Sequence, residues 1–170
     1  MNYFELYDIP QSFDVDQALL KRKFLELSKK YHPDFHTLDG EGAQEDALKM
    51  SVLNNEAYKT LKNKNLLTAY ILELHDVTLN DNDAIPQDFL MEMMDINERL
   101  MDIQMDPNPE AVSAIKEEIN QINKSLLEVK FRLQQDYIVK KDKKLTLERV
   151  KSLYLKSKYM NRLNNQLTRL

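Results

Sequence analysis

The chain has 170 residues, of which 42% are hydrophobic, and a formal net charge of −4, so it is long enough for one mid-sized or two small globular units. It contains only two glycines and no cysteine, which disfavours a sheet-rich or disordered chain and excludes disulfides, thiolate metal sites and a cysteine nucleophile. The N-terminus lacks a signal-peptide pattern, and no segment approaches the roughly 18 consecutive apolar residues of a membrane helix. We therefore expect an all-α cytoplasmic protein with no membrane contact.

The first long helix is expected to run from a capping box of Asp14 and Gln17 to about Tyr31. Its apolar residues are spaced 4, 3 and 4 apart and share one stripe, whereas Arg22 and Lys29 fall on the opposite side. The pattern predicts an amphipathic helix with a core face and a basic face. The apolar stripe consists of Leu20, Phe24, Leu27 and Tyr31.

Two more helices are expected in this first unit, which we bound at residues 1–75. The longer covers about 44–61 and follows a loop at 36–42, and the shorter covers 66–74 and packs back on the pair. The segment 76–86 combines turn-forming residues, three aspartates and a proline between two apolar-periodic regions. It is therefore predicted to be a linker.

His32, Pro33 and Asp34 stand directly after the basic helix. One interpretation is a simple helix-stop turn in which Asp34 accepts backbone hydrogen bonds. A second is a metal site made of His32 and His36. That site is disfavoured because Pro33 breaks the helix that would align the two imidazoles, and neither a third histidine nor a cysteine lies nearby. The turn interpretation remains open from these residues alone.

The second unit, 87–170, is predicted to contain three long helices at 87–105, 110–138 and 146–170. A turn at Asp106-Pro-Asn-Pro separates the first two, and a lysine-rich turn separates the last two. Short turns between long amphipathic helices predict an antiparallel three-helix bundle. The middle helix carries a coiled-coil-like seam of residues spaced alternately three and four apart. The seam consists of Val112, Ile115, Ile119, Ile122, Leu126, Val129 and Leu133.

The net charge hides a strong asymmetry, since residues 76–136 carry −9 and residues 137–170 carry +8. A basic tail could bind nucleic acid, because neutralising phosphates with lysines needs little geometry. The alternative is that the basic last helix packs beside the acidic helices before it, with charged flanks that favour this pairing. We favour the packing interpretation and expect no nucleic-acid partner.

The helix at 87–105 has more apolar surface than one packing seam requires. Its core stripe consists of Phe89, Met93, Ile96, Leu100 and Ile103. A second face lies about 130° away on a helical wheel and consists of Leu90, Met91, Met94, Asp95, Glu98 and Met101. Either the other two helices bury this face, which periodicity alone favours slightly, or it is an exposed methionine-rich surface that binds another protein.

The segment KKYHPD, followed downstream by NNEAYKTL, resembles the J-domain, a hairpin of two antiparallel helices whose loop opens with His-Pro-Asp. In J-domains this loop and the basic face of the preceding helix engage a DnaK-type chaperone and stimulate its ATP hydrolysis. Glu26 departs from the basic residue that many general J-domains have at its position. The resemblance implies a chaperone-binding set of His32, Pro33, Asp34, Lys29, Arg22 and Tyr31.

The order of NYFELYDIP, the J-domain loop, YILELH, FLMEMMDINE and KSKYMNRL is similar to that of the HscB type of J-domain co-chaperone. Proteins of this type bring an IscU-type iron-sulfur scaffold to a dedicated DnaK/HscA-type chaperone, which then promotes release of the cluster to acceptor proteins. Met94 and Asp95 replace the commoner leucine and glutamate. The resemblance implies a scaffold-binding patch of Leu90, Met91, Met94, Asp95, Glu98 and Tyr159.

Some eukaryotic members of that family have a transit peptide and zinc-binding cysteines, and neither is present here. A bacterial cytoplasmic member is therefore expected. A general J-domain co-chaperone with a different client is the alternative. An enzyme is disfavoured, because the sequence has no nucleophile-base constellation, glycine-rich phosphate loop or metal-ligand cluster. We expect a co-chaperone that needs no cofactor.

Overall fold

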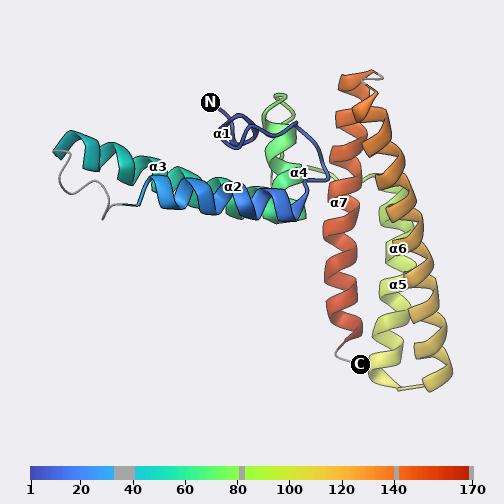
Figure 1. Cartoon of the computed structure of the whole chain (residues 1–170). Helices are drawn as coiled ribbons and strands as arrows, with labels where there is room; N and C mark the ends of the chain where they lie inside the picture. The colour runs from blue at the N-terminus through green and yellow to red at the C-terminus, as the bar shows by residue number, and fades with distance from the viewer. Residues whose placement is uncertain (33–40, 81–82, 140–141, 169–170) are drawn as a thin grey trace. The chain divides into compact units, whose positions relative to one another are not determined.

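The computed structural model describes residues 1–32, 41–80, 83–139 and 142–168. Every regular element in these ranges is a helix, and the described residues contain no strand. They form two compact units, Met1–His75 and Asp76–Leu170. The all-α fold, with a helical hairpin followed by a three-helix bundle, is confirmed (Figure 1).

The described residues of the first unit contain four helices. A short α1 (Tyr3–Leu6) precedes α2 (Gln17–Lys30), which pairs with α3 (Glu41–Lys62), and α4 (Lys64–Glu73) packs against α3 (Figure 1). The hairpin of α2 and α3 buries Leu20 fully and stacks the Phe24 ring on the Tyr58 ring, with centroids 4.2 Å apart. The apolar stripe of α2 therefore faces α3, and the charged side of α2 remains exposed.

The N-terminal cap of α2 differs from the prediction. Asp16 caps the helix, since its carboxylate accepts hydrogen bonds from the backbone N–H of Ala18 at 2.8 Å and of Leu19 at 3.0 Å. The predicted capping box of Asp14 and Gln17 is wrong. Asp14 does not cap the helix, because it lies one turn before the helix begins. Its backbone N–H donates there to the hydroxyl of Ser12.

A buried polar cluster fixes the hairpin from inside. The side-chain amide of Asn54 on α3 donates to the carbonyl of Phe24 at 3.2 Å and to the hydroxyl of Ser28 at 2.9 Å, both on α2. The hydroxyl of Tyr7 donates to Asn54, 2.8 Å from Oδ1. Because a buried amide without partners is costly, these bonds restrict α2 and α3 to one register.

The second unit is a bundle of α5 (Gln87–Met105), α6 (Pro109–Ile138) and α7 (Lys143–Leu167), which lie side by side in Figure 1. Asn108 caps α6 ahead of Pro109, which has the favoured position of a proline in the first turn. The last helix begins three residues earlier than predicted, because Asp142 caps it by accepting from the N–H of Leu145.

The core of the bundle lies where all three helices meet. All five residues of the α5 core stripe are buried against residues of α6 and α7. The α6–α7 hairpin continues past the start of α5, where the Nζ of Lys156 lies 5.2 Å from the centre of the Phe89 ring. Val129 lies in this two-helix part and is exposed, although it lines a pocket between α6 and α7 together with Leu133 and Leu153. The buried residues of the predicted seam are Ile115, Ile119 and Leu133.

The segment predicted as a linker is attached to the second unit by a small polar contact. The Nζ of Lys151 on α7 donates to the carbonyl of Thr78 at 2.8 Å and to the carboxylate of Asp83 at 2.9 Å. The side chain of Val77 is buried. Within the described residues, no helix is long and apolar enough to cross a membrane.

Candidate functional site

The basic face of α2 presents side chains to solvent. Arg22 and Lys29 are exposed. The Nε of Arg22 lies 4.0 Å from the carboxylate of Glu26, with both side chains largely exposed, so this pair offsets part of the positive charge at little energetic gain. Lys29 has no such neighbour among the described residues. The charge available to a partner therefore increases toward the C-terminal end of α2.

The histidine of the predicted chaperone-binding motif follows this end of the helix. Tyr31 is the C-terminal cap of α2, and its N–H donates to the carbonyl of Leu27 at 2.9 Å. His32 is exposed one residue later. Pro33 and Asp34 lie outside the described residues, as does His36 of the disfavoured metal site. The described part of the motif is thus presented at the end of the basic face.

The second face of α5 is exposed. Met91 and Met94 are 66% and 69% exposed, and Leu90 is half-buried. Burial of this face, which periodicity alone favours, is therefore wrong for the two methionines. The reason is geometric, because α6 and α7 both pack on the other side of α5, against the stripe that contains Met93.

The exposed face is also longer than predicted. Met101 and Met105 are 67% and 87% exposed. They follow Met94 by seven and eleven residues, which is the spacing of one helical face. Periodicity places Met101 on this face, but the predicted binding patch contains neither Met101 nor Met105. We call Leu90, Met91, Met94, Met101 and Met105 the methionine face.

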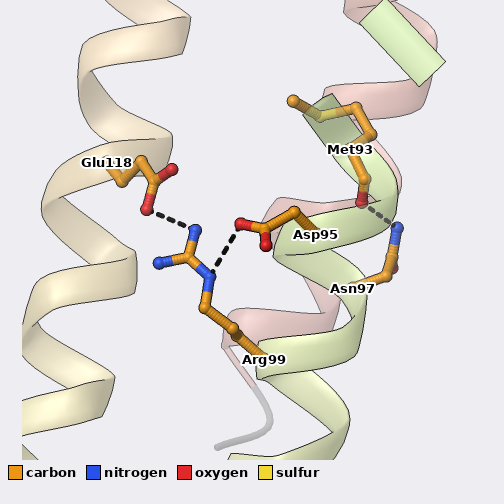
Figure 2. Close-up of polar contacts among 5 residues, drawn as sticks. All are labelled: Met93, Asp95, Asn97, Arg99 and Glu118. Atoms are coloured by element: carbon orange, nitrogen blue, oxygen red, sulfur yellow. Dashed lines mark hydrogen bonds and ion pairs between the residues drawn. The ribbon is translucent and has the colours of Figure 1, made fainter. Parts of the chain in front are cut away.

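Charged groups on the edge of this face are partly neutralised within the chain. The Nη2 of Arg99 donates to the carboxylate of Glu118 on α6 at 2.6 Å, and its Nε lies 3.1 Å from the carboxylate of Asp95 (Figure 2). The hydrogen bond to Glu118, more than the charge of either carboxylate, raises the pKa of Arg99. The negative charge of Asp95 is therefore already partly neutralised by Arg99 within the chain. Glu98 is exposed and has no ion-pair partner among the described residues.

Tyr159 lies on the other edge of the methionine face. The side-chain amide of Asn97 donates to the Tyr159 hydroxyl at 2.6 Å and to the carbonyl of Met93 at 2.7 Å, the second contact being drawn in Figure 2. The Tyr159 ring meets Phe89 edge-on with centroids 6.0 Å apart. Tyr159 of α7 thus contacts α5 through Asn97 and Phe89, which are not part of the predicted scaffold-binding patch.

A cavity of about 470 Å³ lies between α5 and α7 beside Tyr159. Leu100 and Leu163 are buried and form its apolar part, and the guanidinium of Arg162 lies 4.9 Å from the centre of the Tyr159 ring. The sequence does not predict this cavity, because its lining comes from two helices whose relative register is not apparent from either helix alone. The lining consists of Asn97, Leu100, Met101, Gln104, Tyr159, Arg162, Leu163 and Gln166.

The polar side chains around the methionine face can also be compared with the ligand sets of metal sites. No group of three or more histidines, cysteines, aspartates or glutamates is arranged to hold a metal ion among the described residues. The polar groups around the methionine face are carboxylates, amides and guanidinium groups that contact one another or solvent.

Comparison with known proteins agrees with this geometry. Residues 85–168 match the family described as the HSCB C-terminal oligomerisation domain. Co-chaperone protein HscB homologues from Aliivibrio salmonicida and Shewanella baltica are 32% and 30% identical to this chain. The alignments cover 100% and 99% of it and 96% of each relative. The chaperone HscB from Vibrio cholerae has a similar structure, with a TM-score of 0.73, 29% identity and coverage of 99% of this chain and 96% of that one.

The crystal structure of the human co-chaperone protein HscB also has a TM-score of 0.73, with 25% identity over 99% of this chain and 81% of the human chain. Both similarities extend over the hairpin and the bundle, since they cover nearly all of the 170 residues. The matching family, the full-length relatives and the two structures lead to one assignment. The chain belongs to the HscB family of co-chaperone proteins.

Proposed function

We propose that this co-chaperone acts in iron-sulfur cluster transfer in the bacterial cytoplasm by binding two partners with its two units. The second unit would hold an IscU-type scaffold protein on the methionine face of α5. The first would present His32 and the adjoining Pro33 and Asp34 to a DnaK/HscA-type chaperone and stimulate its ATP hydrolysis. The chain itself carries out no chemistry in this proposal.

The observation that carries the scaffold half is the exposure of Met91 and Met94. Large apolar side chains that remain two-thirds exposed on a well-packed helix are typical of a protein-binding surface. Methionine suits such a surface, because its flexible and polarisable side chain adapts to a partner. The two residues occupy positions that match the scaffold-binding patch of HscB-type proteins. Glu98 supplies an unpaired carboxylate at the edge of the same face.

The chaperone half is supported by the arrangement of charge at the end of α2. Exposed cations on this face would attract an acidic surface of the chaperone before contact and raise the rate of encounter. The cluster of Asn54 with Tyr7 and Ser28 fixes the helix that carries those cations. The trigger would then be the motif that begins at His32, held at the end of a rigid helix.

Tethering gives the advantage of joining the two units. A client bound to one unit has a local concentration near the chaperone of roughly millimolar when the connection is short. Delivery therefore needs no direct contact between scaffold and chaperone beforehand. The co-chaperone would increase the fraction of ATP hydrolysis events that occur with a client present.

Steady-state ATP hydrolysis by the purified cognate chaperone tests the proposal. We expect this protein and the scaffold together to raise the hydrolysis rate more than the sum of their separate effects. His32→Gln is expected to abolish the stimulation and to leave the scaffold affinity unchanged, because His32 lies in the other unit. Calorimetry with the same two proteins measures that affinity.

Three outcomes would change the assignment in different ways. Stimulation that depends on His32 but ignores the scaffold would favour the alternative, a general J-domain co-chaperone with another client on α5. A loss of scaffold binding in His32→Gln would contradict the division of labour between the units. Failure of the unmodified protein to stimulate hydrolysis would exclude the chaperone half.

A further inference from the structure

The cavity between α5 and α7 borders the methionine face and has a different chemical character. Its apolar base is formed by Leu100 and Leu163, which are both buried. Met101 belongs to both the cavity lining and the methionine face, so the two surfaces are continuous. A partner lying on the methionine face would therefore reach this cavity without leaving the surface of α5.

The edge of the cavity on α7 is rich in hydrogen-bond donors. Arg162 is exposed, and no carboxylate of a described residue forms an ion pair with it. Its guanidinium is positioned by the Tyr159 ring, 4.9 Å from the ring centre. A guanidinium held over an aromatic ring keeps its donors directed outward, where they match the two oxygens of a carboxylate.

The adjacent hydroxyl of Tyr159 is also available as a hydrogen-bond donor. The Tyr159 oxygen accepts a hydrogen bond from Asn97 at 2.6 Å, which leaves its own proton to be donated. No described residue accepts that proton. Arg162 and Tyr159 thus both offer donors at one side of an apolar cavity, and this combination favours an acceptor that carries negative charge.

Arg99 shows by contrast why Arg162 is available to a partner. Both arginines flank the methionine face, but Arg99 lies within 2.6 Å of Glu118 and 3.1 Å of Asp95. The charge of Arg99 is therefore offset inside the chain and fixes α5 to α6. The charge of Arg162 has no such internal partner in the described part of the chain.

We propose that the cavity between α5 and α7 is a second part of the scaffold-binding surface, and that it accepts a segment of the scaffold with an apolar side chain next to a carboxylate. The apolar side chain would fill the space above Leu100 and Leu163 beside Met101, and the carboxylate would bind the guanidinium of Arg162 and the Tyr159 hydroxyl. This inference rests on the proposed function, because its occupant is the scaffold.

The order of charges would also fix the direction in which the scaffold segment lies. Glu98 follows Asn97 by one residue and so points about 100° away from the cavity. A segment that crosses the methionine face would meet a carboxylate at one edge and a guanidinium at the other. The segment would therefore need a cation and a carboxylate on opposite sides of its apolar residues, and the reverse orientation would bring like charges together.

Calorimetric titration of this protein with the purified iron-sulfur scaffold tests the inference. Arg162→Gln is expected to raise the Kd for the scaffold roughly tenfold, which is typical of the loss of a charge-assisted hydrogen bond. Met101→Ala is expected to raise it severalfold. Lys144→Gln is the matched control, because it removes the same charge from an exposed position of α7 far from the cavity. Circular dichroism verifies that each variant is folded.

The outcomes separate the inference from the proposed function. Unchanged affinity in both Arg162→Gln and Met101→Ala, with binding lost in Met91→Ala plus Met94→Ala, would overturn the second part of the surface and leave the proposed function standing. An equal loss in Lys144→Gln would also overturn it, because the effect would then reflect net charge. Absence of scaffold binding by the unmodified protein would overturn both.

Discussion

The exposed faces of α2 and α5 are built in opposite ways. On α2 the apolar stripe is turned toward α3, and the side facing solvent carries cations such as Arg22 and Lys29. On α5 the core stripe is equally well buried, but the side facing solvent carries methionines, including Met91 and Met94. The solvent-facing side of α2 therefore shows mainly charge, with Leu25 as its exposed apolar residue, whereas that of α5 shows a row of methionines.

This difference indicates two modes of recognition within one chain. Charges act over a distance of about 10 Å at 0.1 M salt and are weakened by further salt. Apolar surfaces attract each other only at van der Waals contact. Their burial contributes roughly 25 cal/mol of binding free energy for each Å², with little effect of salt. In the proposed function, the basic face of α2 would therefore suit a brief, fast encounter with a chaperone. The methionine face of α5 suits prolonged retention of a client.

The largest expected effect comes from removing the apolar contact. Met91→Ala combined with Met94→Ala is predicted to weaken scaffold binding by about 2–4 kcal/mol, the range of an interface hot spot. The melting temperature should change little, because both side chains are mainly exposed. Calorimetry measures the first quantity and circular dichroism the second.

The neighbouring residue Met93 provides the control for that variant. It is fully buried, so Met93→Ala is predicted to destabilise the folded protein by about 2–5 kcal/mol. Similar melting temperatures in the two alanine variants would show that the methionine face is not distinct from the core. A double variant that still binds the scaffold normally would remove the retention role from α5.

The sequence was sufficient for the architecture because each long helix is bounded by local signals. Helix α5 has the predicted bounds of 87–105, and all five residues of its core stripe are buried. The cap of α2 was misplaced because Asp14 and Asp16 are both suitable caps, and only tertiary packing decides between them.

The exposure of particular faces could not be derived in the same way. Periodicity identifies which residues share a face, but it does not show whether a neighbouring helix covers that face. Val129 is exposed because α5 has only 19 residues and does not reach it along the 30-residue α6. The pairing of Arg99 with Glu118 likewise depends on the register between α5 and α6, which one sequence does not specify.

The next effect in size tests whether the charged face of α2 depends on the polar cluster beneath it. Asn54→Ala removes the amide that donates to the carbonyl of Phe24 and the hydroxyl of Ser28, which is predicted to cost about 1–3 kcal/mol of stability, while the Tyr7 hydroxyl keeps the backbone carbonyl of residue 54 at 2.9 Å. Urea denaturation measures the loss, and hydrogen exchange locates it in α2 and α3. Asn55→Ala changes the exposed neighbour and is expected to have almost no effect. Equal stability of the two variants would contradict a structural role for the cluster.

Salt distinguishes the two surfaces without any mutation. Raising the salt concentration from about 0.05 M to about 0.5 M is predicted to increase severalfold the co-chaperone concentration needed for half-maximal ATPase stimulation, because screening weakens the attraction of α2 for an acidic partner. Scaffold affinity should change less. Lys29→Gln, which removes an exposed cation, is expected to reproduce part of the salt effect at low salt. If added salt weakens scaffold binding more steeply than ATPase stimulation, charge matters more for the methionine face than for α2, which would contradict the comparison.

The smallest expected effect concerns the contact that holds the segment before α5. The N–H of Asn80 donates to the carboxylate of Asp83 at 2.7 Å, and this bond, followed by that from Lys151, lowers the pKa of Asp83. A carboxylate with a lowered folded pKa stabilises the fold above its unfolded pKa of about 3.9, and the contribution is lost as pH falls through the folded pKa. Acidification below about pH 4 should therefore loosen residues 76–80 before the bundle unfolds, as hydrogen exchange would measure.

Asp83→Asn separates this contact from the general effect of acid. The variant is expected to exchange the amides of residues 76–80 faster at neutral pH and to show no further increase on mild acidification, because the charge that attracts Lys151 is already absent. Asp76→Asn removes a carboxylate from the same segment but not from this contact, so its acid response should match that of the unmodified protein. If both variants respond alike, acid acts through other carboxylates. If only Asp83→Asn loses the acid response, the ion pair between Asp83 and Lys151 holds residues 76–80 against α7.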